Sequence, residues 1–179
     1  MKERIKNVKS YEDFRKVFEI FKHYPFFEAW NEEEFLEEYK YLKSNGEIFG
    51  SYTNLGDIAG LITMIEGAKE SHPVTFVNPD KVMYISDVAV LEPYRGNGYA
   101  KQLVNFAIEY TKLLNYYEEI YMRTNLENSM SEGIFVQNGF EVMKNNGIII
   151  TEDISFPRTL PDLPETDTRK FLSRKLVIK

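Results

Sequence analysis

The segment VAVLEPYRGNGYAKQLV, residues 88–104, places two glycines between an apolar stretch and an amphipathic one. Glycine adopts positive φ at low cost and lets a ligand come close to the main chain. The first turn of a helix presents unpaired N–H groups that attract an anion. The segment therefore predicts either an anion-binding loop at a helix start or a tight turn that only joins two elements.

Few other residue types in the sequence offer catalytic or metal-binding chemistry. The chain has no cysteine, which excludes disulfides, thiolate metal sites and a cysteine nucleophile. Its two histidines, His23 and His72, are far apart in the sequence and are predicted to be surface or loop residues. No metal site and no Ser-His-Asp triad are therefore expected.

Composition indicates one globular domain over residues 1–179, because 43% of the residues are apolar and 28% are charged. The formal net charge of -6 argues against a nucleic-acid partner and leaves room for a cationic acceptor. The charged first residues lack the apolar core of a signal peptide, and no apolar run reaches membrane-spanning length. We therefore expect a cytoplasmic protein without a membrane partner.

Hydrophobic periodicity and turn signals divide the chain into helices and strands. In chain order they predict a strand at 4–8, a helix from Tyr11, a helix from Asn31 to Asn45, strands at 47–52, 58–65 and 81–90, a helix at 100–114, a strand at 118–124, a helix that begins with a capping box of Ser129 and Glu132, a hairpin at 140–150 and a last strand at 169–179. This order indicates an α/β domain with a mixed central sheet flanked by helices.

Two helix faces carry a clear pattern. The helix at 100–114 has an apolar stripe for packing on a sheet, formed by Leu103, Val104, Ala107, Ile108 and Leu114. The helix from Asn31 carries an acidic run, which is predicted to be a solvated face and consists of Glu32, Glu33, Glu34, Glu37 and Glu38.

Three motifs stand in order between residues 84 and 140. A strand ending in VAV precedes LEPY, RGNGYA fits R/Q-x-x-G-x-G/A, and NSMSEGIFVQNGF fits N-x-x-A-x-x-L-Y-x-x-x-G-F. In the last motif the matching positions are Asn128, Ser131, Ile134, Phe135, Gly139 and Phe140. Together the motifs resemble the GNAT superfamily of acetyl-CoA-dependent N-acetyltransferases. The resemblance implies a GNAT-like mixed sheet with a βαβ coenzyme-binding core.

The resemblance also implies how acetyl-CoA is bound as co-substrate. The backbone from Arg95 to Ala100 would wrap the pyrophosphate, and the main chain of residues 88–90 would pair with the pantetheine arm. The implied coenzyme-binding residues are Val88, Ala89, Val90, Arg95, Gly96, Asn97, Gly98, Tyr99, Ala100, Lys101, Asn128 and Phe135.

The implied reaction is direct attack of a primary amine on the acetyl thioester in a ternary complex. Phe135 stands where the family often has a tyrosine as general acid, and it has no proton to donate. Tyr84 and Ser86 stand where the family often has a base, and neither is basic at neutral pH. Asp87 is nearby, but period-two alternation predicts that it lies on the opposite face from Ser86. A water chain, Glu28 or Glu32 are the remaining candidates for the base.

The acceptor is predicted to be a small-molecule or peptide amine. The implied acceptor-binding residues are Tyr24, Phe27, Trp30, Tyr84 and Ser86, although the aromatic residues before residue 31 are also suited to core packing. The alternative function is a non-catalytic acyl-CoA binding or sensing domain, because no acid or base is assigned. A homodimer formed through an edge strand near the C-terminus is left open.

Overall fold

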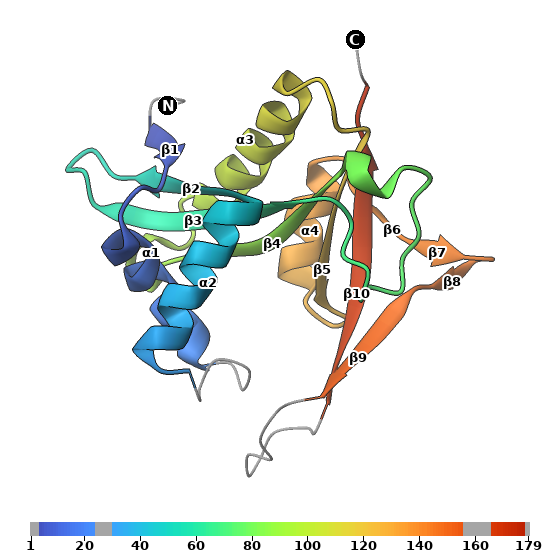
Figure 1. The fold of residues 1–179 in the computed structure, drawn as a ribbon, viewed down its shortest axis with the longest axis horizontal. Helices are drawn as coiled ribbons and strands as arrows, with labels where there is room; N and C mark the ends of the chain where they lie inside the picture. The colour runs from blue at the N-terminus through green and yellow to red at the C-terminus, as the bar shows by residue number, and fades with distance from the viewer. Residues whose placement is uncertain (1–3, 24–29, 156–165, 178–179) are drawn as a thin grey trace.

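The computed structural model describes residues 4–23, 30–155 and 166–177 (Figure 1). Its strands are β1 Ile5–Asn7, β2 Gly46–Tyr52, β3 Ile58–Glu66, β4 Val82–Val90, β5 Glu119–Asn125, β6 Glu141–Val142, β7 Lys144–Asn145, β8 Ile148–Ile149, β9 Thr151–Ser155 and β10 Thr166–Lys175. Its helices are α1 Tyr11–Phe18, α2 Glu32–Asn45, α3 Tyr99–Leu113 and α4 Ser129–Gln137, with short 3-10 helices η2 Glu19–His23, η3 Pro79–Lys81 and η4 Glu92–Tyr94.

The central sheet has eight strands, in the order β1-β2-β3-β4-β5-β10-β6, with β9 paired to β10. Among the described strands, β4 and β5 are the one parallel pair, and α3 makes the crossover between them. The other strand pairs are antiparallel. The predicted mixed α/β fold with a βαβ unit is therefore confirmed.

Helices cover both faces of the sheet (Figure 1). Residues of α1 and α2, among them Phe14 and Phe35, share one buried cluster with strand residues such as Tyr84 and Tyr121. Residues of α3 and α4, among them Val104, belong to a second buried cluster on the opposite face. The predicted stripe of α3 is buried except for Leu114, which lies beyond the helix end and is 42% exposed.

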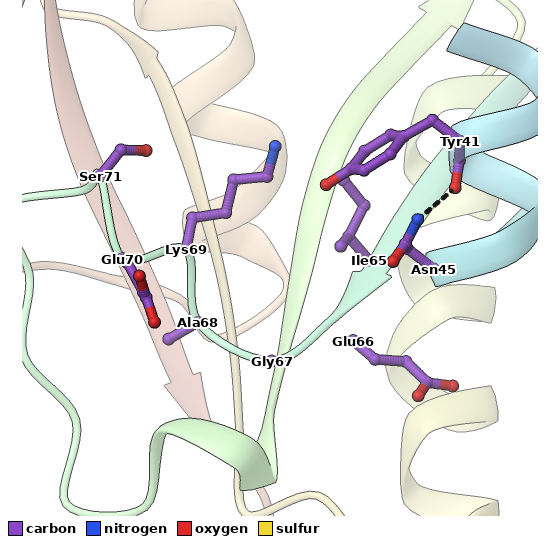
Figure 2. A pocket seen from close by; sticks show the side chains of 9 residues that line it. All are labelled: Tyr41, Asn45, Ile65, Glu66, Gly67, Ala68, Lys69, Glu70 and Ser71. Carbon is purple, nitrogen blue, oxygen red and sulfur yellow. Dashed lines mark hydrogen bonds between the residues drawn. The ribbon is translucent and has the colours of Figure 1, made fainter. Parts of the chain in front are cut away.

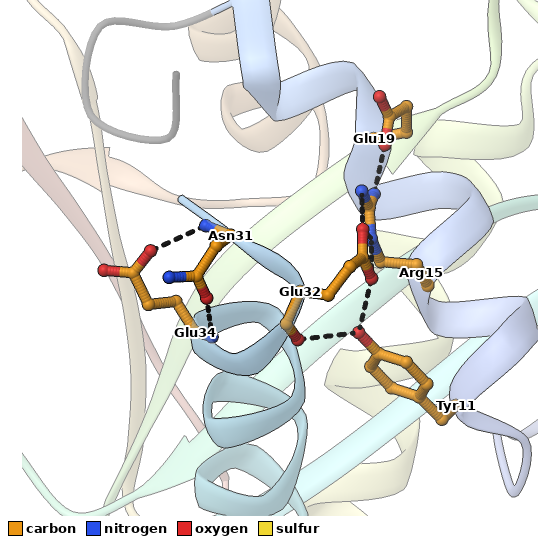
Figure 3. A network of polar contacts seen from close by, with 6 residues as sticks. All are labelled: Tyr11, Arg15, Glu19, Asn31, Glu32 and Glu34. Carbon is orange, nitrogen blue, oxygen red and sulfur yellow. Dashed lines mark hydrogen bonds and ion pairs between the residues drawn. The ribbon is translucent and has the colours of Figure 1, made fainter. Parts of the chain in front are cut away.

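Side-chain caps define where three of the helices begin. Asn31 and Glu34 form the predicted capping box of α2, with Glu34 N–H donating to Asn31 Oδ1 at 3.0 Å (Figure 3). The capping box predicted for Ser129 and Glu132 is wrong, because Asn128 caps α4 instead: its Oδ1 accepts from the N–H of Ser131 at 3.0 Å.

The predicted cap fails because the Glu132 carboxylate is used elsewhere. It pairs with Lys170 of β10, whose side chain is only 8% exposed. A buried ammonium needs a charged partner, so this tertiary contact takes precedence over a local cap. The pair links α4 to β10.

A polar network joins the start of α2 to α1 (Figure 3). Arg15 of α1 pairs with Glu19, the first residue of η2, and with Glu32 at 2.7 Å. The Tyr11 hydroxyl donates to Glu32 at 3.2 Å. The Arg15 guanidinium also lies 4.0 Å from the centre of the Phe35 ring. The Glu32 carboxylate therefore links the start of α2 to α1.

The last strand lies inside the sheet. β10 pairs with β5 along one side and with β9 and β6 along the other, so β9 and β6 border the sheet there. The strand and hairpin entry predicted at 140–150 are present as β6 and the hairpin of β7 and β8, with Asn146 and Gly147 in the turn at positive φ. None of the helices in the described ranges has the length and apolarity needed to cross a membrane.

Candidate active site

The parallel strands β4 and β5 separate halfway along β4. They pair only where residues 82–85 lie beside residues 119–122. Beyond Ile85, β4 stays paired to β3 on its other side, but residues 86–90 have no partner in β5. This separation of the two strands, called the gap below, leaves main-chain groups of β4 without a partner in β5, in the stretch where the sequence implied pantetheine binding. The side chains of Val88 and Ala89 pack in the two cores.

The glycine-containing loop follows the end of β4 directly. Gly96 and Gly98 have φ of 78° and 79°, in the left-handed region that favours glycine. A Cβ added at Gly96 would meet no atom within 4 Å, so backbone conformation and an open space above the loop both mark this position. Residues 95–98 are exposed, Tyr99 and Ala100 are partly buried, and Lys101 is exposed in the first turn of α3.

The start of α3 has no side-chain cap. Gly98 is its N-cap residue, whereas α1, α2 and α4 are each capped by a serine or asparagine side chain. The first N–H groups of this 15-residue helix therefore point toward the open loop without a protein acceptor from the cap. This arrangement fits a phosphate-bearing ligand, because helix N-termini attract anions.

Two side chains of the loop hold its backbone in place. Arg95 Nε donates to the carbonyl of Val90 at 3.1 Å, and Asn97 Nδ2 donates to the carbonyls of Tyr94 and Arg95 at 3.2 and 3.1 Å. These bonds fix the loop relative to the end of β4. Arg95 and Asn97 therefore shape the loop, and the Arg95 N–H also bonds within it, to the carbonyl of Glu92 at 3.1 Å.

A β-bulge at Ser86 changes which side chains of β4 share a face. Thr63 of β3 pairs with Asp87, and the next residue, Met64, pairs with Ile85, so Ser86 is the extra residue. Because Tyr84 pairs with Ile65, two residues from Thr63, Asp87 and Tyr84 lie on the same face of the sheet. The expectation that Asp87 lies on the opposite face from Ser86 assumed strict period-two alternation, which does not hold across the bulge; Asp87 instead shares the face of Tyr84.

The Asp87 carboxylate is held by its neighbours. Thr63 Oγ1 donates to it at 2.7 Å. Burial raises the pKa of Asp87 above its ordinary value, although the hydrogen bonds from Thr63 and Ser86 and the charge of Lys69 oppose the change. Asp87 is therefore a carboxyl group with raised basicity, placed two residues beyond the point where β4 leaves β5.

A second carboxyl group faces Asp87 from α2. Burial raises the pKa of Glu38 to about 7, the charge of Asp87 acts in the same direction, and Lys69 acts against it. Glu32, Glu33, Glu34 and Glu37 are exposed as predicted, but Glu38 is partly buried, so the solvated face does not include it. The signal was present in the sequence, because Glu38 falls between Phe35 and Leu42 in the apolar stripe of the helix.

Aromatic residues line the same face. The centre of the Tyr84 ring lies 4.7 Å from that of Tyr121 and 5.0 Å from that of His72, and the planes of Tyr84 and His72 meet at 77°. Burial raises the pKa of Tyr84, which moves this candidate further from acting as a base at neutral pH. The side chain of Ser86 is partly exposed at the bulge.

His72 lies in the loop between β3 and η3, one of the two predicted locations, but it is buried in this aromatic wall and is no surface residue. Burial lowers the pKa of His72 to about 4, with Arg123 and Lys69 adding to the effect, so the ring is neutral at physiological pH. Tyr121 accepts a hydrogen bond from the Lys69 N–H at 2.9 Å and lies 3.1 Å from His72 Nδ1. The Tyr121 hydroxyl therefore links the Lys69 backbone to the His72 ring.

The remaining predicted residues lie at different places. Phe135 is 2% exposed and packs edge-on against Phe140 at 5.0 Å, in the core beneath α3 and α4. Asn128 is exposed at the start of α4, where its Oδ1 serves as the cap. Trp30 is partly buried against Phe35 at 5.4 Å. Tyr24, Phe27 and Glu28 lie outside the described residues.

The sequence identified Tyr84, Ser86 and the glycine loop as candidate site residues. It did not identify four residues that the structure places near Asp87 or Tyr84: Glu38, Lys69, His72 and Arg123. In the described part of the chain, no cluster of three or more His, Asp or Glu side chains could hold a metal ion. The arrangement instead offers an anion-binding loop, an opened strand edge and two carboxyl groups of raised pKa.

Known proteins share both the sequence pattern and the fold. A sequence model described as the acetyltransferase (GNAT) family matches residues 13–140. No curated protein sequence matches the chain.

Several solved structures resemble the fold over nearly its whole length. A phosphinothricin acetyltransferase from Sinorhizobium meliloti, in complex with AcCoA, is 14% identical with a TM-score of 0.69, covering 96% of this chain and 87% of that one. A ribosomal-protein-alanine N-acetyltransferase from Brucella melitensis is 15% identical with a TM-score of 0.67, covering 96% and 99%. A spermidine N-acetyltransferase from Vibrio cholerae, in complex with CoA and spermine, is 15% identical with a TM-score of 0.67, covering 96% and 94%.

Proposed function

Since this chain belongs to the GNAT family of acetyltransferases, we propose that it transfers an acetyl group from acetyl-CoA to a primary amine by direct attack in a ternary complex. The observation that carries the proposal is the course of β4. Within a few residues this strand leaves β5, presents Asp87 beside the gap and enters the open glycine loop.

Bound acetyl-CoA supplies an acetyl group activated as a thioester. The N–H groups of the loop at 95–98 and of the first turn of α3 would hold its pyrophosphate, together with the exposed ammonium of Lys101. The main chain of Val88 to Val90 would pair with the pantetheine arm along the edge that β5 leaves open. Asn128 and Phe135 remain predicted contacts.

Asp87 is the proposed acceptor of the amine proton, with Glu38 as its coupled partner. An amine reaches the site mostly as ammonium and must lose a proton before its nitrogen can attack the acetyl carbon. A carboxylate of raised pKa holds that proton better than an ordinary one, because general bases work best with a pKa near the working pH. Main-chain N–H groups of β4 that face the gap would stabilise the negative charge on the acetyl oxygen.

The leaving group is expected to depart without a proton from Phe135, which is an apolar side chain in the core. A thiol has a pKa of about 8.5, so its thiolate is a tolerable leaving group near neutral pH. The non-catalytic alternative was motivated by the lack of an assigned base. The position of Asp87 weakens that motivation.

The test measures release of free thiol from acetyl-CoA over a panel of amines. Asp87→Asn should lower kcat/KM by about 10²- to 10⁴-fold, the usual contribution of a general base. Affinity for coenzyme A, measured by calorimetry, should stay unchanged. Asp57→Asn is the matched control, because Asp57 is exposed in the turn between β2 and β3.

Two outcomes would contradict the proposal. Thermal stabilisation by coenzyme A without turnover on any amine would favour a binding or sensing domain. Failure of coenzyme A to bind at all would overturn both functions.

A further inference from the structure

An open cavity of about 370 Å³ lies between the end of α2 and the segment after β3 (Figure 2). Tyr41 and Asn45 of α2 line one side, and Asn45 Nδ2 donates to the Tyr41 carbonyl at 2.9 Å. The backbone from Gly67 to Ser71 lines the other side and carries Lys69. The proposed acetyl transfer assigns no role to this cavity.

The Lys69 ammonium is the distinctive charge of the cavity. It lies 5.4 Å from the centre of the Tyr41 ring and 5.9 Å from that of Tyr84, so it bridges the cavity and the proposed catalytic face. Within the described ranges it forms no ion pair, whereas Arg123 on the same face pairs with Glu152 at 2.7 Å. Lys69 therefore keeps the capacity to bind an anion.

The acidic residues lining the cavity are directed away from this ammonium. Figure 2 shows that the Glu66 and Glu70 carboxylates point away from the end of the Lys69 side chain. Glu66 instead makes a hydrogen bond with Tyr117. Burial raises the pKa of Tyr117 to about 12, and the charge and hydrogen bond of Glu66 add to this effect.

The segment that carries Lys69 is held in position by β5. The Lys69 N–H donates to the Tyr121 hydroxyl at 2.9 Å, and Tyr121 also contacts His72 further along the segment. The fixed backbone reduces the freedom that this segment loses when a ligand binds beside Lys69, which favours specific recognition.

We propose that this cavity binds a carboxylate group of the acceptor, so that the acceptor is an amine that also carries a carboxylate, as an amino acid does. The inference rests on the proposed acetyl transfer. Charge complementarity supports it: Glu38 and Asp87 suit the ammonium of such a zwitterion, and Lys69 suits its carboxylate.

The test compares two amine acceptors that have the same side chain, an amino acid and its carboxamide. The wild-type protein should prefer the acid in kcat/KM. Lys69→Met should reduce this preference, the ratio of the two kcat/KM values, by about 10- to 100-fold, the range for loss of a charged hydrogen bond. Lys69→Arg should keep the preference. Lys40→Met, which removes an exposed lysine of α2, should leave the ratio and both rates unchanged.

The ratio separates anion binding from an indirect effect of Lys69 on Glu38 and Asp87. An indirect effect lowers both rates equally and leaves the ratio unchanged, which would overturn the inference. So would a wild-type protein without preference for the acid.

Calorimetry with coenzyme A present gives a second readout. Binding of the amino acid should be lost in Lys69→Met and kept in Lys40→Met, even if no thiol is released from acetyl-CoA. Failure of turnover would therefore count against acetyl transfer alone, and equal binding to both variants would count against the carboxylate site.

Discussion

Replacing Glu38 by glutamine should make the protein more stable at alkaline pH. Burial raises the pKa of this carboxyl from its ordinary 4.5 to about 7, so the folded chain holds its proton more tightly than the unfolded chain does. The favourable contribution of the protonated form is complete below the unfolded pKa and is lost as pH rises through the folded one. Glutamine carries no charge and avoids this loss.

The expected gain follows from the pKa difference. Each unit of difference between the folded and the unfolded pKa corresponds to about 1.4 kcal/mol, which gives about 3 to 4 kcal/mol for Glu38 as an upper value. Because the side chain keeps some contact with solvent, screening reduces the expected gain to about 2 kcal/mol. Removing the Glu38 charge also eases ionisation of Asp87, which acts in the same direction.

Urea unfolding of wild type and variant at about pH 5 and about pH 8 measures the effect. Glu38→Gln should raise the free energy of unfolding by about 2 kcal/mol more at the higher pH than at the lower pH. Glu37→Gln, at an exposed position of the same helix, should show no such difference. An equal effect of Glu38→Gln at both pH values would refute the reasoning.

Two further substitutions test the coenzyme-binding region. Gly98→Ala should cost about 1 to 2 kcal/mol of stability, because alanine is strained at a φ of 79°, and should also weaken binding of coenzyme A measured by calorimetry. Gly56→Ala, at a φ of 88° in the turn between β2 and β3, is its control and should lower stability alone. Asn128→Ala should cost about 1 kcal/mol in urea unfolding through loss of the α4 cap. Asn128→Ser should keep the cap but weaken coenzyme binding if the asparagine amide contacts the coenzyme; equal affinity would assign Asn128 to capping only.

The fold was largely predictable because its elements have strong local signals. The apolar runs of β3 and β4 and the stripe of α3 have lengths and periods that distinguish strand from helix. Asn31 and Glu34 mark the start of α2 by local hydrogen bonding alone. Such features depend on residues near one another in the sequence.

The site was less predictable because it depends on distant partners. The bulge at Ser86 arises from the register between β3 and β4, which no local pattern in β4 reveals. The burial of His72 depends on Tyr84, Tyr121 and Phe171, which come from other strands. The Glu132 side chain leaves its expected cap for Lys170, 38 residues away. Each of these contacts forms only when the sheet is assembled.

The bulge gives Ser86 a role that depends on its presence more than on its hydroxyl. A strand that contains a bulge bends and twists more strongly than a regular one, and β4 leaves β5 at this residue. Deleting Ser86 would keep Asp87 opposite Thr63, because Ile85 already pairs with Met64. It would also straighten the strand and allow the ladder with β5 to extend across the gap. Loss of one residue at this position would therefore close the gap, whereas a change in the residue type there would leave it open.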